Sequence, residues 1–138
     1  MVELIIIKKY LHEFHDGALL NIEHAGHTYI FTLESAEMDP LDMKDVIILS
    51  QRGTIKGKLH IENIEHVKVN ELTFQHELNM QYDYGSIFDL NIQNNIIEIQ
   101  VSWRNSPQKP YVNDFSTIVL KSKNIWWENL PDLSDPFW

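Results

Sequence analysis

The sequence predicts a mainly β, single-domain protein, built as an antiparallel β-sandwich or a curled, barrel-like sheet. Many short segments alternate apolar and polar residues with the period of two that strands show. Gly, Asn and Pro residues separate these segments and mark the turns between them. A length of 138 residues suits one domain, so we expect a single β-rich domain over residues 1–138, with a three-strand meander and at most one short helix.

The first predicted strands lie between residues 2 and 34. Val2–Tyr10 is rich in β-branched residues, which favours a strand. Ala18–His24 is expected to pair with Thr28–Glu34 across a short loop that contains Gly26, because glycine adopts positive φ at low cost.

Alternation stops between Ser35 and Lys44 and resumes afterwards. Any helix in this gap is short or begins at Pro40, because proline disfavours the α conformation in the residue before it. Thr54–Ile61 alternates clearly and predicts a strand with one solvated face. Gly57 within it predicts a bulge or a close neighbour, and Ile64–Val69 predicts a further strand.

The meander is predicted in the second half of the chain, where three alternating segments follow one another with short turns between them. A proline-containing loop and one or two last strands complete the fold, before an irregular tail. The predicted meander strands are 78–84, 88–92 and 97–103, their turns are 84–86 and 94–95, and the last strands are 116–121 and 124–127.

Composition excludes several kinds of chemistry. The chain has no cysteine, which removes disulfides, thiolate zinc sites, iron–sulfur clusters and cysteine nucleophiles. Its five glycines are scattered singly, so a glycine-rich phosphate loop is absent, and no serine occupies a Gly-x-Ser-x-Gly elbow. We expect no cofactor and no catalytic residues.

Charge and hydropathy limit the partners. The formal net charge of −9 predicts repulsion from phosphate backbones, so we expect no nucleic-acid partner. No apolar run approaches the roughly 20 residues that span a bilayer, and none has the order of a secretory signal. We therefore expect a cytoplasmic protein with no membrane partner.

The motif Phe14-His15-Asp16-Gly17 invites two interpretations. A His-Asp pair occurs in metal-dependent phosphohydrolases, but those enzymes carry it on a helical bundle, which this sequence does not predict. The favoured interpretation is a structural turn that bends the chain into the strand at Ala18, with Phe14 anchored in the core. The chain has seven histidines, but their spacing predicts no converging set of ligands, so we expect no bound metal.

An acidic segment and an exposed tryptophan predict a binding surface. If Trp127 packs with Ile125, Trp126 points outward, where it can anchor a partner or be covered by the C-terminal tail with Phe137 or Trp138. The candidate binding residues are Glu37, Asp39, Asp42, Asp45 and Trp126.

Three motifs resemble a group of small bacterial β-rich proteins. They are FHDGALLNIEH at residues 14–24, YIFTLES at 29–35 and IKGKLHIENIEHVKVN at 55–70. In that group a Phe-His-Asp-Gly or Phe-His-Asp-Ala turn opens the fold, and some of its proteins are similar to immunity proteins of bacterial toxin systems. The resemblance implies a binding role and no catalytic residue.

Two functions follow from these observations. The first is a non-enzymatic protein-binding module, most concretely an immunity-like protein that neutralises a basic toxin domain through an acidic face. The second is a small ligand-binding or hydrolytic β-domain that uses histidines and carboxylates in a cleft. The sequence does not predict the identity of the partner or the oligomeric state.

Overall fold

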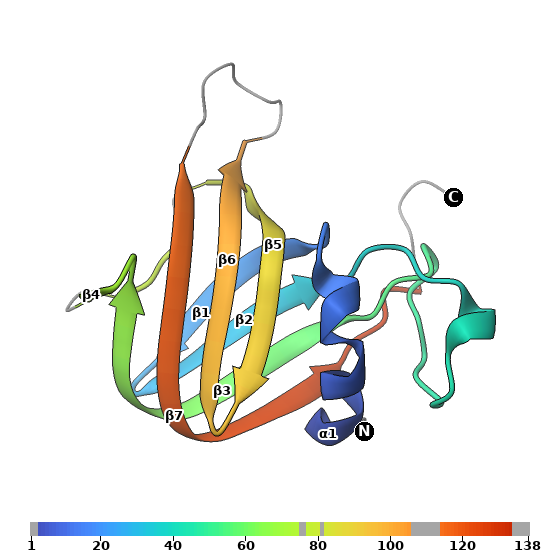
Figure 1. The fold of residues 1–138 in the computed structure, drawn as a ribbon, viewed down its shortest axis with the longest axis horizontal. Coiled ribbons are helices and arrows are strands. Elements are labelled where there is room, and N and C mark those ends of the chain that lie inside the picture. The colour runs from blue at the N-terminus through green and yellow to red at the C-terminus, as the bar shows by residue number, and fades with distance from the viewer. Residues whose placement is uncertain (1–2, 75–76, 81, 106–113, 134–138) are drawn as a thin grey trace.

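The computed structural model describes residues 3–74, 77–80, 82–105 and 114–133. Its seven strands form one antiparallel sheet in the order β2-β1-β5-β6-β7-β3-β4, and β2 also pairs with β3 (Figure 1). That extra pairing closes the sheet into a barrel, which confirms the predicted curled, mainly β fold. The strands are β1 (Ala18–Ala25), β2 (Thr28–Glu34), β3 (Lys56–Val69), β4 (Leu72–Thr73), β5 (Tyr84–Gln93), β6 (Ile96–Arg104) and β7 (Phe115–Asn129).

The described part of the chain becomes helical at Leu4, so the strand predicted over Val2–Tyr10 is wrong for residues 4–10; Val2 lies outside the described residues. Helix α1 (Leu4–Ile7) runs directly into the 3₁₀ helix η1 (Lys8–Phe14). Ile7, Tyr10 and Phe14 are buried at spacings of three and four residues, the period of a helix face. This packing overrides the β-propensity of the isoleucines.

The predicted hairpin near the N-terminus is present. β1 and β2 pair from Ala18↔Glu34 to Ala25↔Thr28, and Gly26 in the connecting loop adopts a φ of 61°. The burial of β2 alternates along its whole length, with Tyr29, Phe31 and Leu33 turned into the core. A further short helix, η2 (Pro40–Asp42), begins at the proline, as predicted.

Two long strands, β3 and β7, each replace a predicted pair of shorter ones. They pair with each other from Gly57↔Asn129 to Val69↔Ile118, with a register shift between Ile64 and His66. β3 carries the extra residue at this shift, a bulge that lets the two paired strands bend (Figure 1). At Gly57 an added Cβ would lie 2.2 Å from the carbonyl oxygen of Glu128, which confirms the predicted close neighbour.

The three-strand meander is β5-β6-β7, one strand later than predicted. The β5–β6 turn at Asn94-Asn95 was expected, and both residues have positive φ, of 52° and 61°. None of the described residues between 77 and 83 is in a strand, and Gly85 lies within β5 rather than in a turn. A Cβ at Gly85 would meet the Val101 side chain at 3.2 Å, so glycine serves packing there.

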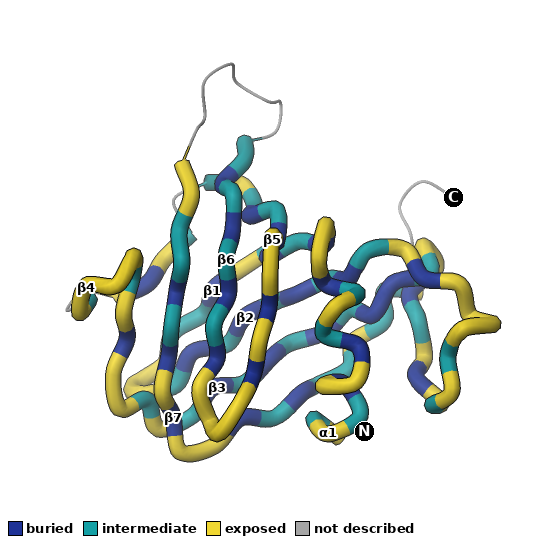
Figure 2. The backbone as a smooth tube through the Cα atoms, in the orientation of Figure 1, coloured by how far each residue is buried: buried dark blue, intermediate teal, exposed yellow. Residues whose placement is uncertain are grey.

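The barrel interior is a continuous apolar core, and Figure 2 shows buried residues along every wall of it.

The seam between the neighbouring strands β1 and β5 is weakly joined, because few of their residues pair. Pairing between β1 and β5 is limited to Ala18↔Ser86 and Leu19↔Gly85, so the two strands diverge beyond that point. Beyond the end of β3, the residues Asn70 and Glu71 turn the chain into the short β4 with positive φ at both positions.

Candidate functional site

The Phe14–Gly17 segment is a tight turn that leads from η1 into β1. Phe14 is fully buried, and its ring meets that of Trp127 edge-on at a centroid distance of 6.1 Å. Asp16 carries the positive φ of the turn, at 68°. Gly17 is required for a steric reason and not for its φ, because a Cβ there would lie 2.2 Å from the Glu34 carbonyl oxygen.

Backbone hydrogen bonds attach this turn to β5. The Asp16 N–H donates to the Ile87 carbonyl at 2.9 Å, and the Ile87 N–H donates to the Gly17 carbonyl at 2.9 Å. A ring nitrogen of His15 contacts the Phe88 carbonyl oxygen. The His15 and Phe88 side-chain rings also meet edge-on, with a centroid distance of 5.5 Å. The structure therefore places all four motif residues in one braced corner of the barrel.

The acidic segment lies in a long connection between β2 and β3, which we call the acidic lobe (residues 36–55). It projects beside the barrel, at the right of Figure 1. Three of its own side chains, Met38, Ile47 and Ile55, are buried. The Met38 N–H donates to the Gly53 carbonyl at 2.9 Å, which ties its two ends together. The acidic lobe is therefore held in place by these contacts, with the short η2 as its one helix.

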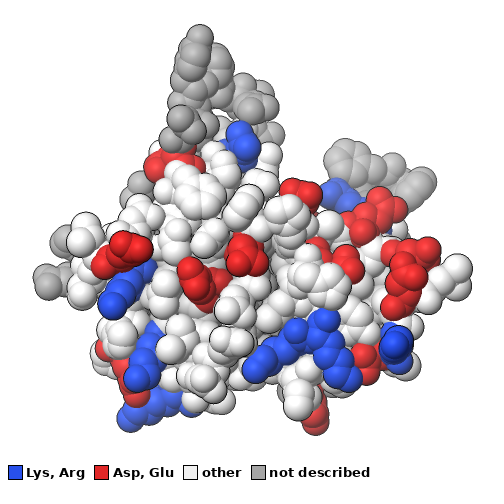
Figure 3. Space-filling view, viewed as in Figure 1, with Lys and Arg blue, Asp and Glu red and all other residues white. Residues whose placement is uncertain are grey.

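Three of the predicted binding carboxylates are displayed by this lobe. Glu37, Asp39 and Asp42 are all exposed. The Asp39 side chain accepts a hydrogen bond from the Leu41 N–H at 2.9 Å and caps η2. Figure 3 shows acidic side chains gathered at the edge where Figure 1 places the lobe, with basic ones nearby over the helical segment.

Asp45 has a different role from the other three. Its carboxylate accepts a hydrogen bond from the Tyr10 hydroxyl at 2.8 Å and lies 3.5 Å from the Lys9 ammonium group. The same hydroxyl accepts hydrogen bonds from the backbone N–H groups of Lys44 and Asp45. We call this arrangement the Tyr10 clasp, and it fastens the lobe to η1.

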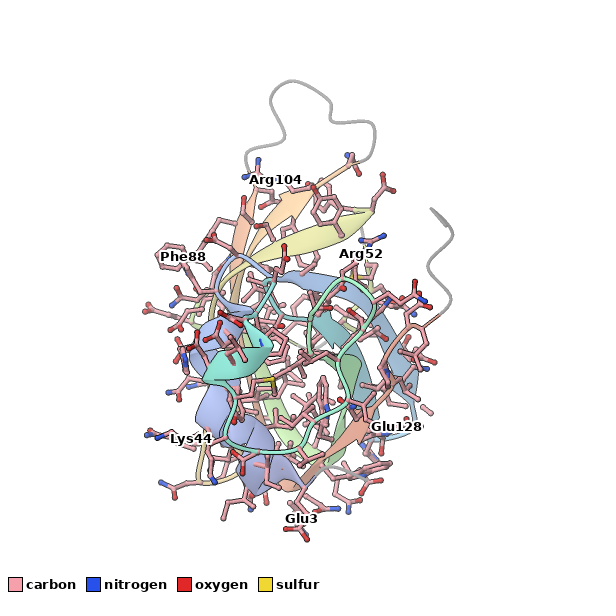
Figure 4. All side chains as sticks on the ribbon, turned by 90° about the vertical axis from the view of Figure 1, so that its right-hand side faces the viewer. Glu3, Lys44, Arg52, Phe88, Arg104 and Glu128 are labelled. Atoms are coloured by element: carbon pink, nitrogen blue, oxygen red, sulfur yellow. The ribbon has the colours of Figure 1, made fainter. Side chains whose placement is uncertain are left out.

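The lobe also exposes large aliphatic side chains. Leu41 is 91% exposed and Val46 is 95% exposed, although both lie in an ordered, anchored segment. Ile48 is 61% exposed on the same connection. Figure 4 looks onto this side of the molecule, with Lys44 and Arg52 toward opposite sides of the lobe. Exposed apolar side chains on a segment that also displays carboxylates are a composition expected of a binding surface.

Trp126 lies on the barrel wall rather than on the lobe. Its ring stacks on His60 of β3, with a centroid distance of 3.8 Å and an interplanar angle of 7°. His60 in turn contacts the Glu128 carboxylate at 2.9 Å. The neighbouring Trp127 points inward and is 1% exposed. The predicted alternative cover, Phe137 or Trp138, lies outside the described residues. The assignment of Trp126 to the binding face stays a prediction.

The histidines are distributed over the molecule. Within the described ranges 3–74, 77–80, 82–105 and 114–133, no three His, Asp or Glu side chains are grouped closely enough to hold a metal ion. His12 contacts Glu13 at 3.1 Å, and His24 contacts Glu77 at 3.2 Å while stacking on Tyr29. His76 lies outside the described residues.

A cavity of about 240 Å³ opens at the end of the barrel where β6 ends and β7 begins, and we call it the mouth cavity. Its lining combines apolar and aromatic side chains with the polar side chains of Asn70, Asn79 and Ser116, and two carboxylates also line it. The sequence did not single out this cavity, because its walls come from five separate parts of the chain. The residues used below are Ile22, Phe74, Glu77, Leu78, Tyr82, Trp103, Asp114 and Ile118.

Sequence reasoning also missed the exposed aliphatic residues of the lobe. Leu41 and Val46 are apolar residues set among carboxylates and outside any predicted strand. The surrounding carboxylates are the signal of surface exposure there, because the helical spacing of Leu41 with Met38 extends over a single turn.

The sequence and the structure were compared with known families, proteins and solved structures. No family model, no curated protein and no solved structure matches this chain. The resemblance to small bacterial β-rich proteins therefore stays a prediction. Among the described residues, none of the helices has the length and apolar character needed to cross a bilayer.

Proposed function

We propose that this protein is a non-enzymatic binding module that recognises a basic protein partner through the acidic lobe, in the manner of an immunity protein that neutralises a toxin. The observation that carries the proposal is the exposure of Leu41 and Val46 on an anchored segment that also displays Glu37, Asp39 and Asp42. The proposal includes a cytoplasmic setting, in which a toxin domain would be met.

The two kinds of side chain have separate roles in this proposal. Burying a leucine or valine side chain at an interface stabilises a complex by roughly 1.5–3 kcal/mol before ordering costs. The carboxylates steer a basic partner and raise the association rate more than the affinity. The buried lobe residues Met38, Ile47 and Ile55 hold the lobe in one conformation. This reduces the conformational entropy that is lost when a partner binds.

Affinity capture tests the proposal directly. The immobilised protein is presented with the product of the neighbouring gene, and with lysate of the source cells, at low and high salt. We expect a basic partner whose capture weakens as salt rises. The double variant Leu41→Ser and Val46→Ser should slow capture little but accelerate release, whereas Glu37→Gln with Asp39→Asn and Asp42→Asn should slow association.

Matched variants elsewhere on the surface provide the control. Leu72→Ser removes an aliphatic side chain that is 74% exposed on β4, outside the lobe. Glu65→Gln, Asp89→Asn and Glu98→Gln remove three charges from the barrel wall. The proposal fails if the lobe variants and these controls change capture equally, or if the captured partner is acidic.

The second function, a ligand-binding or hydrolytic domain, has one specific observation in its favour, the mouth cavity. That cavity contains carboxylates but is built mainly by aromatic and aliphatic walls. Its geometry favours binding of a small molecule over hydrolysis at a cluster of histidines.

A further inference from the structure

The mouth cavity has an apolar floor. Leu78 and Trp103 are each 6% exposed, Ile118 is 2% exposed and Ile22 is 9% exposed, and all four line the cavity. They come from β1, β6, β7 and the segment before β5, so the cavity lies where β1 diverges from β5. An apolar group placed against this floor would lose contact with water on the side that faces these four residues.

Aromatic rings form much of the wall. Phe74, Tyr82 and Trp103 all line the cavity, and the Tyr82 and Trp103 rings stack with centroids 5.9 Å apart. The Trp103 indole N–H donates to the Ser116 hydroxyl at 2.9 Å, which fixes its ring. Aromatic faces attract cations through their quadrupoles as well as packing against apolar groups.

The edge of the cavity is negative. Glu77 and Asp114 both line it and are exposed, and no Lys or Arg is among the described residues that line it. The Asp114 carboxylate accepts a hydrogen bond from the Tyr82 hydroxyl at 2.8 Å, and Glu77 lies 3.2 Å from a ring nitrogen of His24. A phenol is a neutral donor, so it positions the Asp114 carboxylate without cancelling its charge.

We propose that the mouth cavity binds a small organic cation, with a compact apolar body on the floor formed by Ile22, Leu78, Trp103 and Ile118 and an ammonium head at Asp114 and Glu77. This site is separate from the acidic lobe and does not depend on the proposed function. The volume of about 240 Å³ suits a ligand with a single ring or a short branched chain, since a cavity of roughly 150 Å³ accommodates benzene.

The charge requirement of the site can be isolated with three probes of similar size. Phenethylamine is the cationic probe, 2-phenylethanol the neutral one and phenylacetate the anionic one. Each is titrated into the full chain at neutral pH, and the Trp103 indole N–H signal is followed by NMR after its assignment with Trp103→Phe. We expect phenethylamine to shift this signal saturably, 2-phenylethanol to bind about tenfold more weakly and phenylacetate to bind least.

Variants at the edge separate charge from shape. Asp114→Asn and Glu77→Gln keep the size of each side chain, and each should weaken phenethylamine binding about tenfold without changing 2-phenylethanol binding. Glu71→Gln is the matched control, since Glu71 is exposed in the β3–β4 turn beside the cavity and does not line it. The amide spectrum of each variant verifies that the barrel is folded.

Two results would overturn the proposal. One is a set of equal affinities for the amine and the alcohol, which would leave an apolar pocket without charge selection. The other is the absence of any saturable shift in the Trp103 signal with all three probes. Because neither result involves the lobe, the proposed protein-binding function would be unaffected.

Discussion

At the scale of single residues, Gly57 is the position where the barrel tolerates least change. A Cβ there would lie 2.2 Å from the Glu128 carbonyl oxygen and 2.7 Å from a ring carbon of Trp127. We expect Gly57→Ala to lower the free energy of unfolding by about 1–3 kcal/mol, the range for overpacking, measured by urea denaturation.

Gly26→Asn is the matched control for that experiment. Nothing lies within 4 Å of the position a Cβ would take at Gly26, and asparagine tolerates its φ of 61°. Its stability should stay within about 0.5 kcal/mol of the unmodified protein. Equal losses in both variants would contradict the crowding argument.

Tyr82 gives a prediction about pH. The hydrogen bond to the Asp114 carboxylate is the main cause that raises the pKa of the Tyr82 phenol above its ordinary value of 10.0, with desolvation and the carboxylate's charge adding to it. Stability from this contact is complete below pH 10.0 and is lost as the pH rises through the folded-state pKa.

Asp114→Asn tests the cause of that shift. We expect the variant to lower the pKa of Tyr82 toward 10.0, because the charged acceptor is gone. NMR titration of the Tyr82 ring signals, assigned with Tyr82→Phe, measures the change. An unchanged pKa of Tyr82 would show that Asp114 is not the cause.

Some single residues could be interpreted from sequence and others could not. Gly57 stood in an alternating strand, where glycine has a limited set of uses, and the close neighbour was predicted. Gly85 followed a tyrosine and preceded a serine, which is also the pattern of a turn. Its use, to admit Val101 and Trp103, depends on a strand that is distant in sequence and leaves no local signal.

At the scale of elements, the Tyr10 clasp joins the helical segment to the lobe. Tyr10→Phe removes one hydroxyl that makes hydrogen bonds to Asp45 and to two backbone N–H groups. We expect a loss of roughly 1–2 kcal/mol in unfolding free energy and faster amide exchange at Lys44 and Asp45. Tyr84→Phe on β5 serves as the control, with no change in exchange at the lobe.

The elements predicted wrongly share a physical reason. Isoleucines at residues 5–7 favour a strand locally, but the buried positions Ile7, Tyr10 and Phe14 follow helical spacing and fit against the barrel. The alternation at residues 78–84 was genuine, yet the Leu78 N–H donates to the Tyr29 hydroxyl instead of to a strand. Tertiary contacts therefore decided both segments.

At the scale of the whole molecule, the weakly joined seam between β1 and β5 predicts uneven protection. β1 pairs with β2 along its length but with β5 at only Ala18 and Leu19. We expect alternate amides of β1 beyond Leu19, those turned toward β5, to exchange faster than the amides turned toward β2. Hydrogen exchange followed by NMR measures this, and uniform protection along β1 would contradict it.

The candidate sites were only partly accessible from the sequence. The acidic residues between 37 and 45 are adjacent in the chain, so a local charge pattern located the lobe. The contact of Asp45 with the Tyr10 hydroxyl was hidden, because the two residues lie 35 positions apart in the chain. The mouth cavity was hidden more completely, since Ile22, Trp103 and Asp114 meet only when the barrel closes.

The paired strands β3 and β7 set how far apart the two candidate sites lie. β3 begins at the base of the lobe and ends beside the mouth cavity, while β7 runs the opposite way and ends at Asn129, whose side chain donates to the Ile48 carbonyl at 3.0 Å. Along β3 this ribbon runs roughly 40 Å and bends at the register shift between Ile64 and His66. Under the two proposals above, a macromolecule bound at the lobe would therefore leave the mouth cavity open to solvent, and occupancy of one site would not block the other.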